Sequence, residues 1–263
     1  MTDNTETIDV SGARLEIEWL GACQDEDGRV LVFLHEGLGC VKLWQKFPHA
    51  LSERLGLPSF IYNRQGYGKS DPVTLPRTVR FMHDEGLEVL PKVLDTADID
   101  RAILIGHSDG ASITLINAGG VQDPRVEPVV LLAAHVFNEY ITVKSIEEAK
   151  LAFETTNLRD KLAMYHGTNV DCAFWGWNDV WLNPEFKTWN IENYLPGIAV
   201  PALVIQGKDD QYGTSAQLDA IQAGIGDNAT VPLIPGCGHS PHLEQTQITL
   251  DLIASFVEKL PNS

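Results

Sequence analysis

The sequence predicts an α/β protein with a mostly parallel sheet that helices cover on both faces. Short, continuously apolar runs such as 30–34, 102–105 and 128–133 recur along the chain, and segments with helical spacing separate them. Strands without polar alternation are typical of parallel sheets that are buried on both faces. A hydrophobic content of 44% in 263 residues is enough for a substantial core.

The predicted elements follow one another in a regular order. Alternating apolar residues between Ile8 and Trp19, on either side of Ser11-Gly12, indicate two antiparallel strands. After them, buried strands alternate with helices, as parallel sheets require. These are a strand at 30–34, a helix at 43–55, a strand at 59–62, a helix at 79–94 with a break or kink at Pro91, strands at 102–105, 128–133 and 202–205, a helix at 214–225, a strand at 230–234 and a helix at 243–260.

Residues 136–196 interrupt this alternation. They contain no clear buried strand, yet they hold 11 of the 21 aromatic residues. A stretch of about 60 residues is too long for a connecting loop in a compact domain. We therefore expect a helical cap at 136–196, inserted into an α/β core formed by 1–135 and 197–263. We expect most of its aromatic residues to pack inside the cap rather than to line a pocket.

Charge and composition limit the partners. A net charge of −17 argues against nucleic acid, an anionic membrane surface and strongly anionic substrates. The N-terminal residues lack the pattern of a signal peptide, and no apolar run is long enough for a membrane span. We expect a cytoplasmic protein that acts on a small molecule without metal or cofactor; the sequence does not indicate its oligomeric state. The cysteines are widely spaced and typical of reduced thiols: Cys23, Cys40, Cys172 and Cys237.

The segment Gly106-His107-Ser108-Asp109-Gly110 has the G-x-S-x-G pattern of a nucleophile elbow. It lies between the apolar runs 102–105 and 111–116, which predict a strand before the serine and a helix after it. Glycines on both sides allow the strand and the helix to approach closely. The N-terminus of that helix would favour negative charge that develops next to the serine.

A serine nucleophile also needs a base and an acid that orients the base. The expected chain order is serine, acid, histidine, with the last two after late strands. The run 204–207 leads into a turn with Asp209 and Asp210, and the run 233–234 leads into a glycine-rich loop with His239. This arrangement indicates a triad in which either acid could serve.

Four further segments each match a sequence motif of one known protein family. They are LHEGLG at 34–39, YNRQGYGKS at 62–70, GKDD at 207–210 and GHSPHLE at 238–244. With the elbow, they make the chain resemble serine hydrolases of the α/β-hydrolase fold over nearly its whole length except the cap. The resemblance implies a mostly parallel, eight-stranded sheet with helices on both faces.

The resemblance also implies the site residues. Ser108 would be the nucleophile, His239 the base, and Asp210 rather than Asp209 the orienting acid. The backbone N–H groups of Gly37 and Asp109 would form the oxyanion hole, where loss of one donor typically costs about 3 kcal/mol in the barrier.

Two carboxylates depart from the family pattern. Glu36 stands where a glycine is common, and Asp109 follows the nucleophile. A carboxylate near the oxyanion would oppose it unless its charge is balanced. We expect Glu36 to pair with Arg64 of the neighbouring loop; alternatively, one of the two acids receives a cationic or hydroxyl group of the substrate.

Together these features predict a hydrolase that cleaves an ester or related acyl bond of a small, fairly apolar molecule through an acyl-enzyme. Thioesters and lactones fit the same chemistry. Hydrolysis of a C–C bond in a diketone or ring-fission product is an alternative on the same triad, and a non-catalytic binding protein of the same fold is another. The candidate pocket residues are Glu36, Phe137, Trp175, Trp177 and Trp181.

Overall fold

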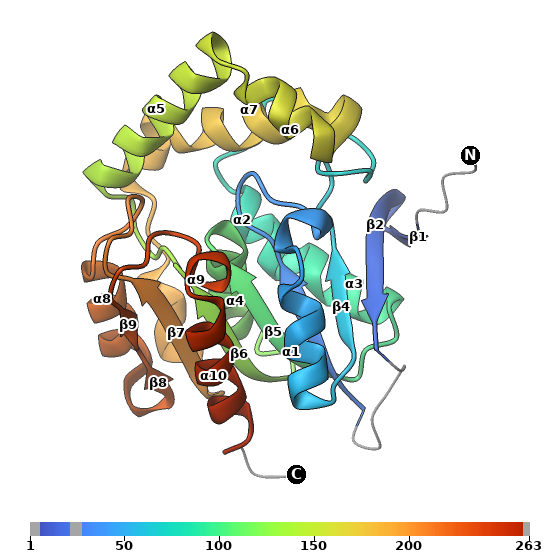
Figure 1. Cartoon of the computed structure of the whole chain (residues 1–263), viewed down its shortest axis with the longest axis vertical. Coiled ribbons are helices and arrows are strands. Elements are labelled where there is room, and N and C mark those ends of the chain that lie inside the picture. Colours follow the sequence, from blue (N-terminus) through green and yellow to red (C-terminus); the bar gives the residue numbers. More distant parts are fainter. Residues whose placement is uncertain (1–5, 22–27, 260–263) are drawn as a thin grey trace.

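The computed structural model describes residues 6–21 and 28–259. Within them, the strands are β1 (Glu6–Val10), β2 (Ala13–Leu20), β3 (Arg29–Leu34), β4 (Ser59–Tyr62), β5 (Arg101–His107), β6 (Val126–Leu132), β7 (Ala202–Gly207), β8 (Ala229–Thr230) and β9 (Leu233–Ile234). They form one twisted sheet through the middle of the molecule (Figure 1) in the order β1-β2-β4-β3-β5-β6-β7-β8, with β9 also paired to β7. The pairs β1–β2 and β2–β4 are antiparallel, and the other pairs are parallel.

Helices cover both faces of this sheet. The α-helices are α1 (Phe47–Leu55), α2 (Phe81–Asp84), α3 (Leu90–Thr96), α4 (Asp109–Gly120), α5 (Tyr140–Thr155), α6 (Leu158–His166), α7 (Val170–Trp181), α8 (Ala216–Ile225), α9 (Pro241–Glu244) and α10 (Thr246–Val257). Shorter 3-10 and π segments are η1 (Val41–Trp44), η2 (Glu85–Val89), η3 (Gly167–Asn169), η4 (Pro184–Thr188), η5 (Glu192–Gly197) and η6 (Gly226–Asn228).

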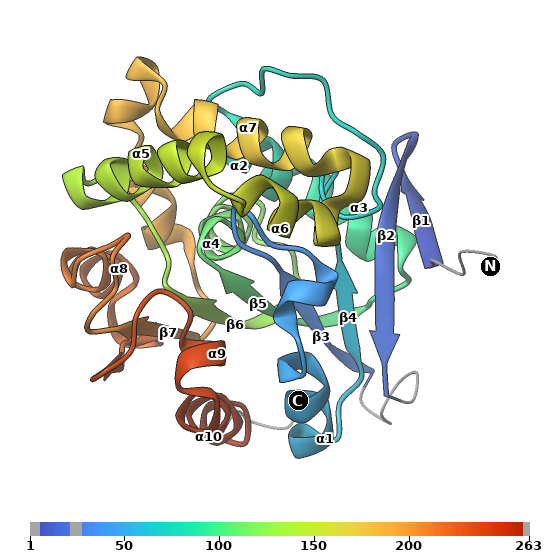
Figure 2. The same cartoon turned by 45° about the horizontal axis from the view of Figure 1, so that its top comes forward.

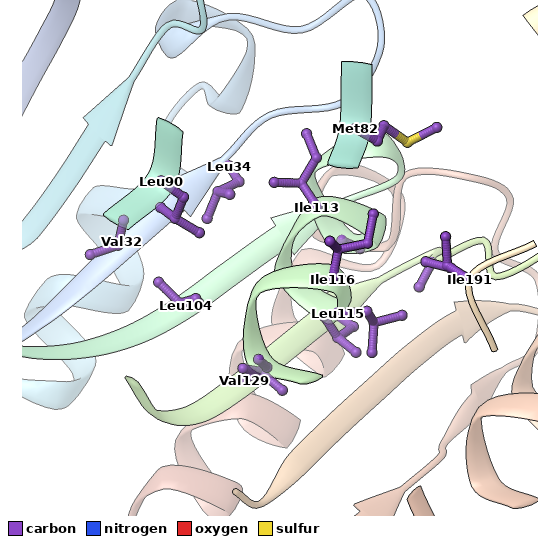
Figure 3. Packing of buried hydrophobic residues seen from close by; sticks show 14 of the residues in the cluster. Val32, Leu34, Met82, Leu90, Leu104, Ile113, Leu115, Ile116, Val129 and Ile191 are labelled. Atoms are coloured by element: carbon purple, nitrogen blue, oxygen red, sulfur yellow. The ribbon is translucent and has the colours of Figure 1, made fainter. Parts of the chain in front are cut away.

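The side chains of β3 show why its run is apolar throughout. Leu31 and Phe33 pack with α1 and α10 on one face of the sheet. Val32 and Leu34 point to the other face, where α3, α4 and α8 contribute to a second cluster. Figure 3 shows Val32 and Leu34 on this second side, with residues of α4 such as Ile113 nearby. Both clusters exclude water from the sheet, and their apolar burial stabilises the layered fold.

Two elements differ from the sequence prediction because of proline. The helix expected at 79–94 does not break at Pro91; α2 runs through the π turn η2 into α3, which has Pro91 in its first turn. The wider π turn lies directly before the residue that cannot donate a backbone hydrogen bond. The final strand expected at 230–234 is divided into β8 and β9, with Pro232 between them, since proline interrupts a hydrogen-bonded ladder.

The helices α5, α6 and α7, which we call the cap helices, lie over the end of the sheet where the parallel strands finish (Figures 1 and 2). They follow β6 in the chain, and the segment then returns through η4 and η5 to β7. This position places the cap helices above the loops that follow β3, β5 and β7. Gly37, Ser108 and Asp210 of the predicted site follow these three strands, and His239 follows β9.

Candidate active site

Ser108 occupies the sharp turn between β5 and α4. Its backbone φ of 52° and ψ of −116° lie in a region that side-chain-bearing residues rarely adopt. A Cβ added to Gly110 would lie 2.0 Å from the carbonyl oxygen of Leu34, and one added to Gly106 would lie 2.4 Å from that of Gly110. The two glycines are therefore required for the close approach of strand and helix that exposes the serine.

His239 connects Ser108 to Asp210. Its Nε2 lies 3.0 Å from Ser108 Oγ, and its Nδ1 lies 2.9 and 3.0 Å from the two carboxylate oxygens of Asp210. Asp210 follows β7, and His239 lies in the loop between β9 and α9. Three segments that are distant in sequence thus bring a hydroxyl, an imidazole and a carboxylate into one hydrogen-bonded chain.

The environment keeps Asp210 ionised. Burial alone would raise the pKa of Asp210, but the hydrogen bond and charge of His239 and the backbone N–H of Tyr212 lower it below its usual value. An ionised Asp210 accepts the Nδ1–H of His239, so Nε2 is free to accept the serine proton. Asp209 is exposed to solvent, and its backbone N–H donates to the carbonyl of Cys237.

Gly37 and Asp109 both lie beside Ser108, on the wall of the same cavity. Neither backbone N–H donates a hydrogen bond to another residue of the described ranges 6–21 and 28–259. Both are therefore available to an oxyanion, although an oxyanion hole at these positions stays a prediction. A Cβ at Gly37 would lie 2.2 Å from the indole ring of Trp177, so α7 packs directly on this loop.

A cavity of about 90 Å³ adjoins Ser108 under the cap helices. Of the predicted pocket residues, Glu36, Trp177 and Trp181 line it. Phe137 and Trp175 do not: Phe137 forms a β-bridge with Asn190, and Trp175 packs edge-on against Phe153 and Phe174. Their inclusion was wrong, because sequence does not show which face of the cap each ring occupies. The full lining is Glu36, Gly37, Leu38, Ser108, Asp109, His135, Thr142, Ile146, Trp177, Trp181, Tyr212 and His239.

The expected ion pair between Glu36 and Arg64 is absent from the described structure. Arg64 donates instead to the backbone carbonyl of Glu36, at 2.9 Å. The Glu36 carboxylate lies 3.3 Å from Nδ1 of His107. The side chain of Arg64 is fully buried, and the carboxylates whose charges act on it are Asp109 and Glu85.

Asp109 is one of the carboxylates on which the positive charge of Arg64 acts. Its Oδ1 accepts a hydrogen bond from the indole N–H of Trp181 at 3.1 Å, and the whole residue is buried. Burial raises the pKa of Asp109 above its usual value, although the positive charge of Arg64 and the Trp181 hydrogen bond oppose the rise. The two unusual acids thus have different partners: Glu36 contacts a histidine, and Asp109 contacts a cap tryptophan and interacts with the charge of Arg64.

Sequence reasoning missed several cavity residues. His135 lies just after β6, and its ring lies 3.1 Å from the carbonyl oxygen of Tyr212 through Nε2. Burial lowers the pKa of His135 to about 4, which keeps it neutral. Its position after a buried strand was an available signal. Thr142 and Ile146 lie four residues apart on one face of α5, a spacing that becomes informative only once the helix is placed.

Among the described residues, no group of three or more histidine, cysteine, aspartate or glutamate side chains is placed to hold a metal ion. Every helix within the described ranges is too short or too polar to cross a membrane. Cys40, Cys172 and Cys237 are unpaired, and Cys23 lies outside the described residues.

Comparison with known proteins agrees with this architecture. A family model described as the alpha/beta hydrolase family matches residues 31–252. The fold is similar to the enol-lactonase of Burkholderia xenovorans LB400, with 21% identity, a TM-score of 0.76, and coverage of 97% of this chain and 100% of that one. It is also similar to the meta-cleavage product hydrolase of Pseudomonas fluorescens IP01, with 17% identity, a TM-score of 0.71 and 97% coverage of both chains. A search of curated protein sequences found no match.

Proposed function

The chain belongs to the alpha/beta hydrolase family, and from this premise we propose that it is a serine hydrolase of ester or related acyl bonds. The observation that carries the proposal is the continuous hydrogen-bonded chain from Ser108 through His239 to Asp210. In the proposed reaction, His239 takes the Ser108 proton as Oγ attacks the acyl carbon. The backbone N–H groups of Gly37 and Asp109 stabilise the oxyanion, and the leaving group departs with a proton from His239.

Water then completes the cycle. With His239 again neutral, a water molecule in the place of the leaving group gives its proton to Nε2 and attacks the acyl-enzyme. As the tetrahedral intermediate collapses, the bond between Ser108 Oγ and the acyl carbon breaks, His239 returns the proton to Oγ, and a carboxylic acid is released. The proposed cap at 136–196 closes over this site.

The cavity supports a small substrate with an apolar portion. Its volume of about 90 Å³ is modest, and indole rings of Trp177 and Trp181 with Leu38 and Ile146 supply much of its wall. Such a wall stabilises an apolar group, while the polar groups beside Ser108 orient the reacting bond. We therefore propose esters of small acids, with lactones and thioesters of similar size as further candidates.

A substrate panel with Ser108→Ala as the matched control tests this function. Short-chain esters, thioesters, a lactone and a ring-fission diketone are assayed with both proteins, and the folded state of each is checked by circular dichroism. We expect ester turnover by the native chain and loss of acylation in Ser108→Ala. Turnover of the diketone alone would favour C–C bond hydrolysis on the same triad.

Labelling with a fluorophosphonate separates an enzyme from a binding protein. The reagent reacts only with an activated serine, so the native protein should be labelled and Ser108→Ala should not. A native protein that binds small molecules in the cavity but is never labelled would contradict a hydrolytic function.

A further inference from the structure

His107 lies between two hydrogen-bond acceptors. Its Nδ1 lies 3.3 Å from the carboxylate of Glu36, and its Nε2 lies 2.8 Å from the backbone carbonyl oxygen of His239. A carbonyl oxygen can only accept a hydrogen bond, and so can an ionised carboxylate. A neutral imidazole has a single N–H and can satisfy one of them. Both contacts are satisfied together only when His107 carries a proton on each nitrogen.

We propose that His107 is held as an imidazolium and acts as a positioning residue, which keeps the loop of the catalytic His239 in place and neutralises Glu36 beside the oxyanion site. Its own side chain is buried and is not part of the cavity lining, whereas the side chain of Glu36 is 26% exposed and Glu36 is one of the lining residues. The contacts of His107 with Glu36 and with the His239 carbonyl therefore connect the loop after β3, the elbow and the loop of His239.

The titratable groups around His107 do not place a second positive charge beside it. The ring of His242, on α9, lies 4.7 Å from that of His107, and burial together with the His107 charge lowers the pKa of His242. His242 is therefore neutral, and so is His35, which lies beside Glu36, because burial and Arg64 lower its pKa. The remaining groups that face His107 are Asp210, which favours the cation, and the ring of His239 at 5.2 Å.

The electrostatics agree with the geometry. Burial alone would lower the pKa of His107, but the hydrogen bond and charge of Glu36 and the carbonyl of His239 raise it above its usual value. Burial would raise the pKa of Glu36, and the His107 partner instead brings it well below its usual range. Glu36 is thus a carboxylate whose charge the histidine cancels.

Loss of the His107 proton has a catalytic consequence, which rests on the proposed function. Above its pKa, His107 keeps one hydrogen bond at most, and the negative charge of Glu36, one residue before Gly37, is then unbalanced. A hydrolase limited only by the protonation of His239 reaches a plateau at high pH. We therefore expect an additional alkaline limb, along which kcat/KM falls up to about tenfold per pH unit.

Glu36→Gln isolates this effect. The glutamine amide has the same shape and can donate to Nδ1 of a neutral His107, whose Nε2–H still donates to the His239 carbonyl. We expect this variant to lose the alkaline limb, whatever its maximal kcat/KM. Asp209→Asn is the matched control, since it removes one negative charge from the exposed turn near the site and should keep the limb. An unchanged limb in Glu36→Gln would overturn the catalytic consequence.

Nitrogen NMR of the histidine rings tests the protonation state without any assay of activity. In protein labelled with ¹⁵N-histidine, the His107 ring should keep two protonated nitrogens to a pH above the usual imidazole pKa of about 6.5, and to a higher pH than in Glu36→Gln. His107→Gln identifies the signal by its absence. A native His107 that loses its second proton at or below about pH 6.5 would refute the inference. If the native protein hydrolyses none of the panel, the proposed function fails, and the NMR result still decides the state of His107.

Discussion

Asp209 and Asp210 are adjacent in sequence but have different environments. Both oxygens of Asp210 lie within 3.0 Å of His239 Nδ1, whereas Asp209 is exposed on the turn. Replacement of Asp210 by Asn removes the charge that stabilises the protonated histidine and can hold the ring in the wrong tautomer. We expect Asp210→Asn to lower kcat by about 10³- to 10⁴-fold, with Asp209→Asn within about twofold of the native value.

Steady-state kinetics on the best ester of the panel measure both effects. KM should change little in either variant, because neither carboxylate contacts the substrate. A loss of activity in Asp209→Asn as large as that in Asp210→Asn would contradict the assignment of the orienting acid.

Single residues show where prediction from the sequence stops. Ser108, Asp210 and His239 could be located because each follows a recognisable strand, and parallel strands end at the same edge of a sheet. The partner of Glu36 could not be located in this way. Glu36 and Arg64 do lie on neighbouring loops, but whether a guanidinium meets a carboxylate or the carbonyl of the same residue depends on side-chain direction, which a sequence pattern does not contain.

At the scale of elements, α7 is the cap helix whose Trp177 packs on the loop of Gly37 at the site. Phe174, Trp177 and Trp181 follow a spacing of three and four residues and are buried on one face of the helix. Trp175 lies off this face and remains partly exposed. The sequence contains this spacing, yet it does not show whether the buried face meets the core or another cap helix. The predicted pocket therefore included Trp175 wrongly.

Two of the three tryptophans on α7, Trp177 and Trp175, give a matched test of the cavity. Trp177→Ala removes an indole that lies against Gly37 and should enlarge the cavity. We expect the ratio of kcat/KM for a longer acyl ester to that for a shorter one to rise about tenfold. Trp175→Ala removes the same ring outside the cavity and should leave the ratio unchanged. Equal ratios in both variants would show that Trp177 does not limit acyl length.

At the scale of the whole molecule, buried neutral histidines are distributed through the fold and not confined to the active site. Burial is the largest cause of a lowered pKa at each of them. They are His35, His135, His166 and His242, and the partly buried His83 shows the same effect. His107 is the exception, with a raised pKa. Stability should therefore depend on pH in a range where ordinary carboxylates, which titrate at about pH 4, are still ionised. Asp109 and Glu85, whose pKa values burial raises, contribute to this dependence with the opposite sign.

The sign of this dependence follows from proton binding. Between the lowered pKa of a buried histidine and its value of about 6.5 in the unfolded chain, only the unfolded chain binds the proton. The free energy of unfolding should therefore fall as the pH falls from about 6.5. For His135 alone, a folded pKa of about 4 corresponds to a loss of the order of 3 kcal/mol once both states are protonated. His107 has the opposite effect. Its contribution to the free energy of unfolding is complete below about pH 6.5 and is lost as the pH rises through its raised pKa in the folded state.

Urea unfolding at a series of pH values between about 7 and about 5 measures this dependence, and its slope gives the number of protons taken up on unfolding. We expect an uptake of more than one proton, because several histidines contribute with the same sign. His135→Gln retains an amide donor for the Tyr212 carbonyl but cannot titrate, so its slope should be smaller by up to one proton. A free energy of unfolding that stays constant over this range would mean that the buried histidines gain protons without unfolding, and the neutral states assigned to them here would be wrong.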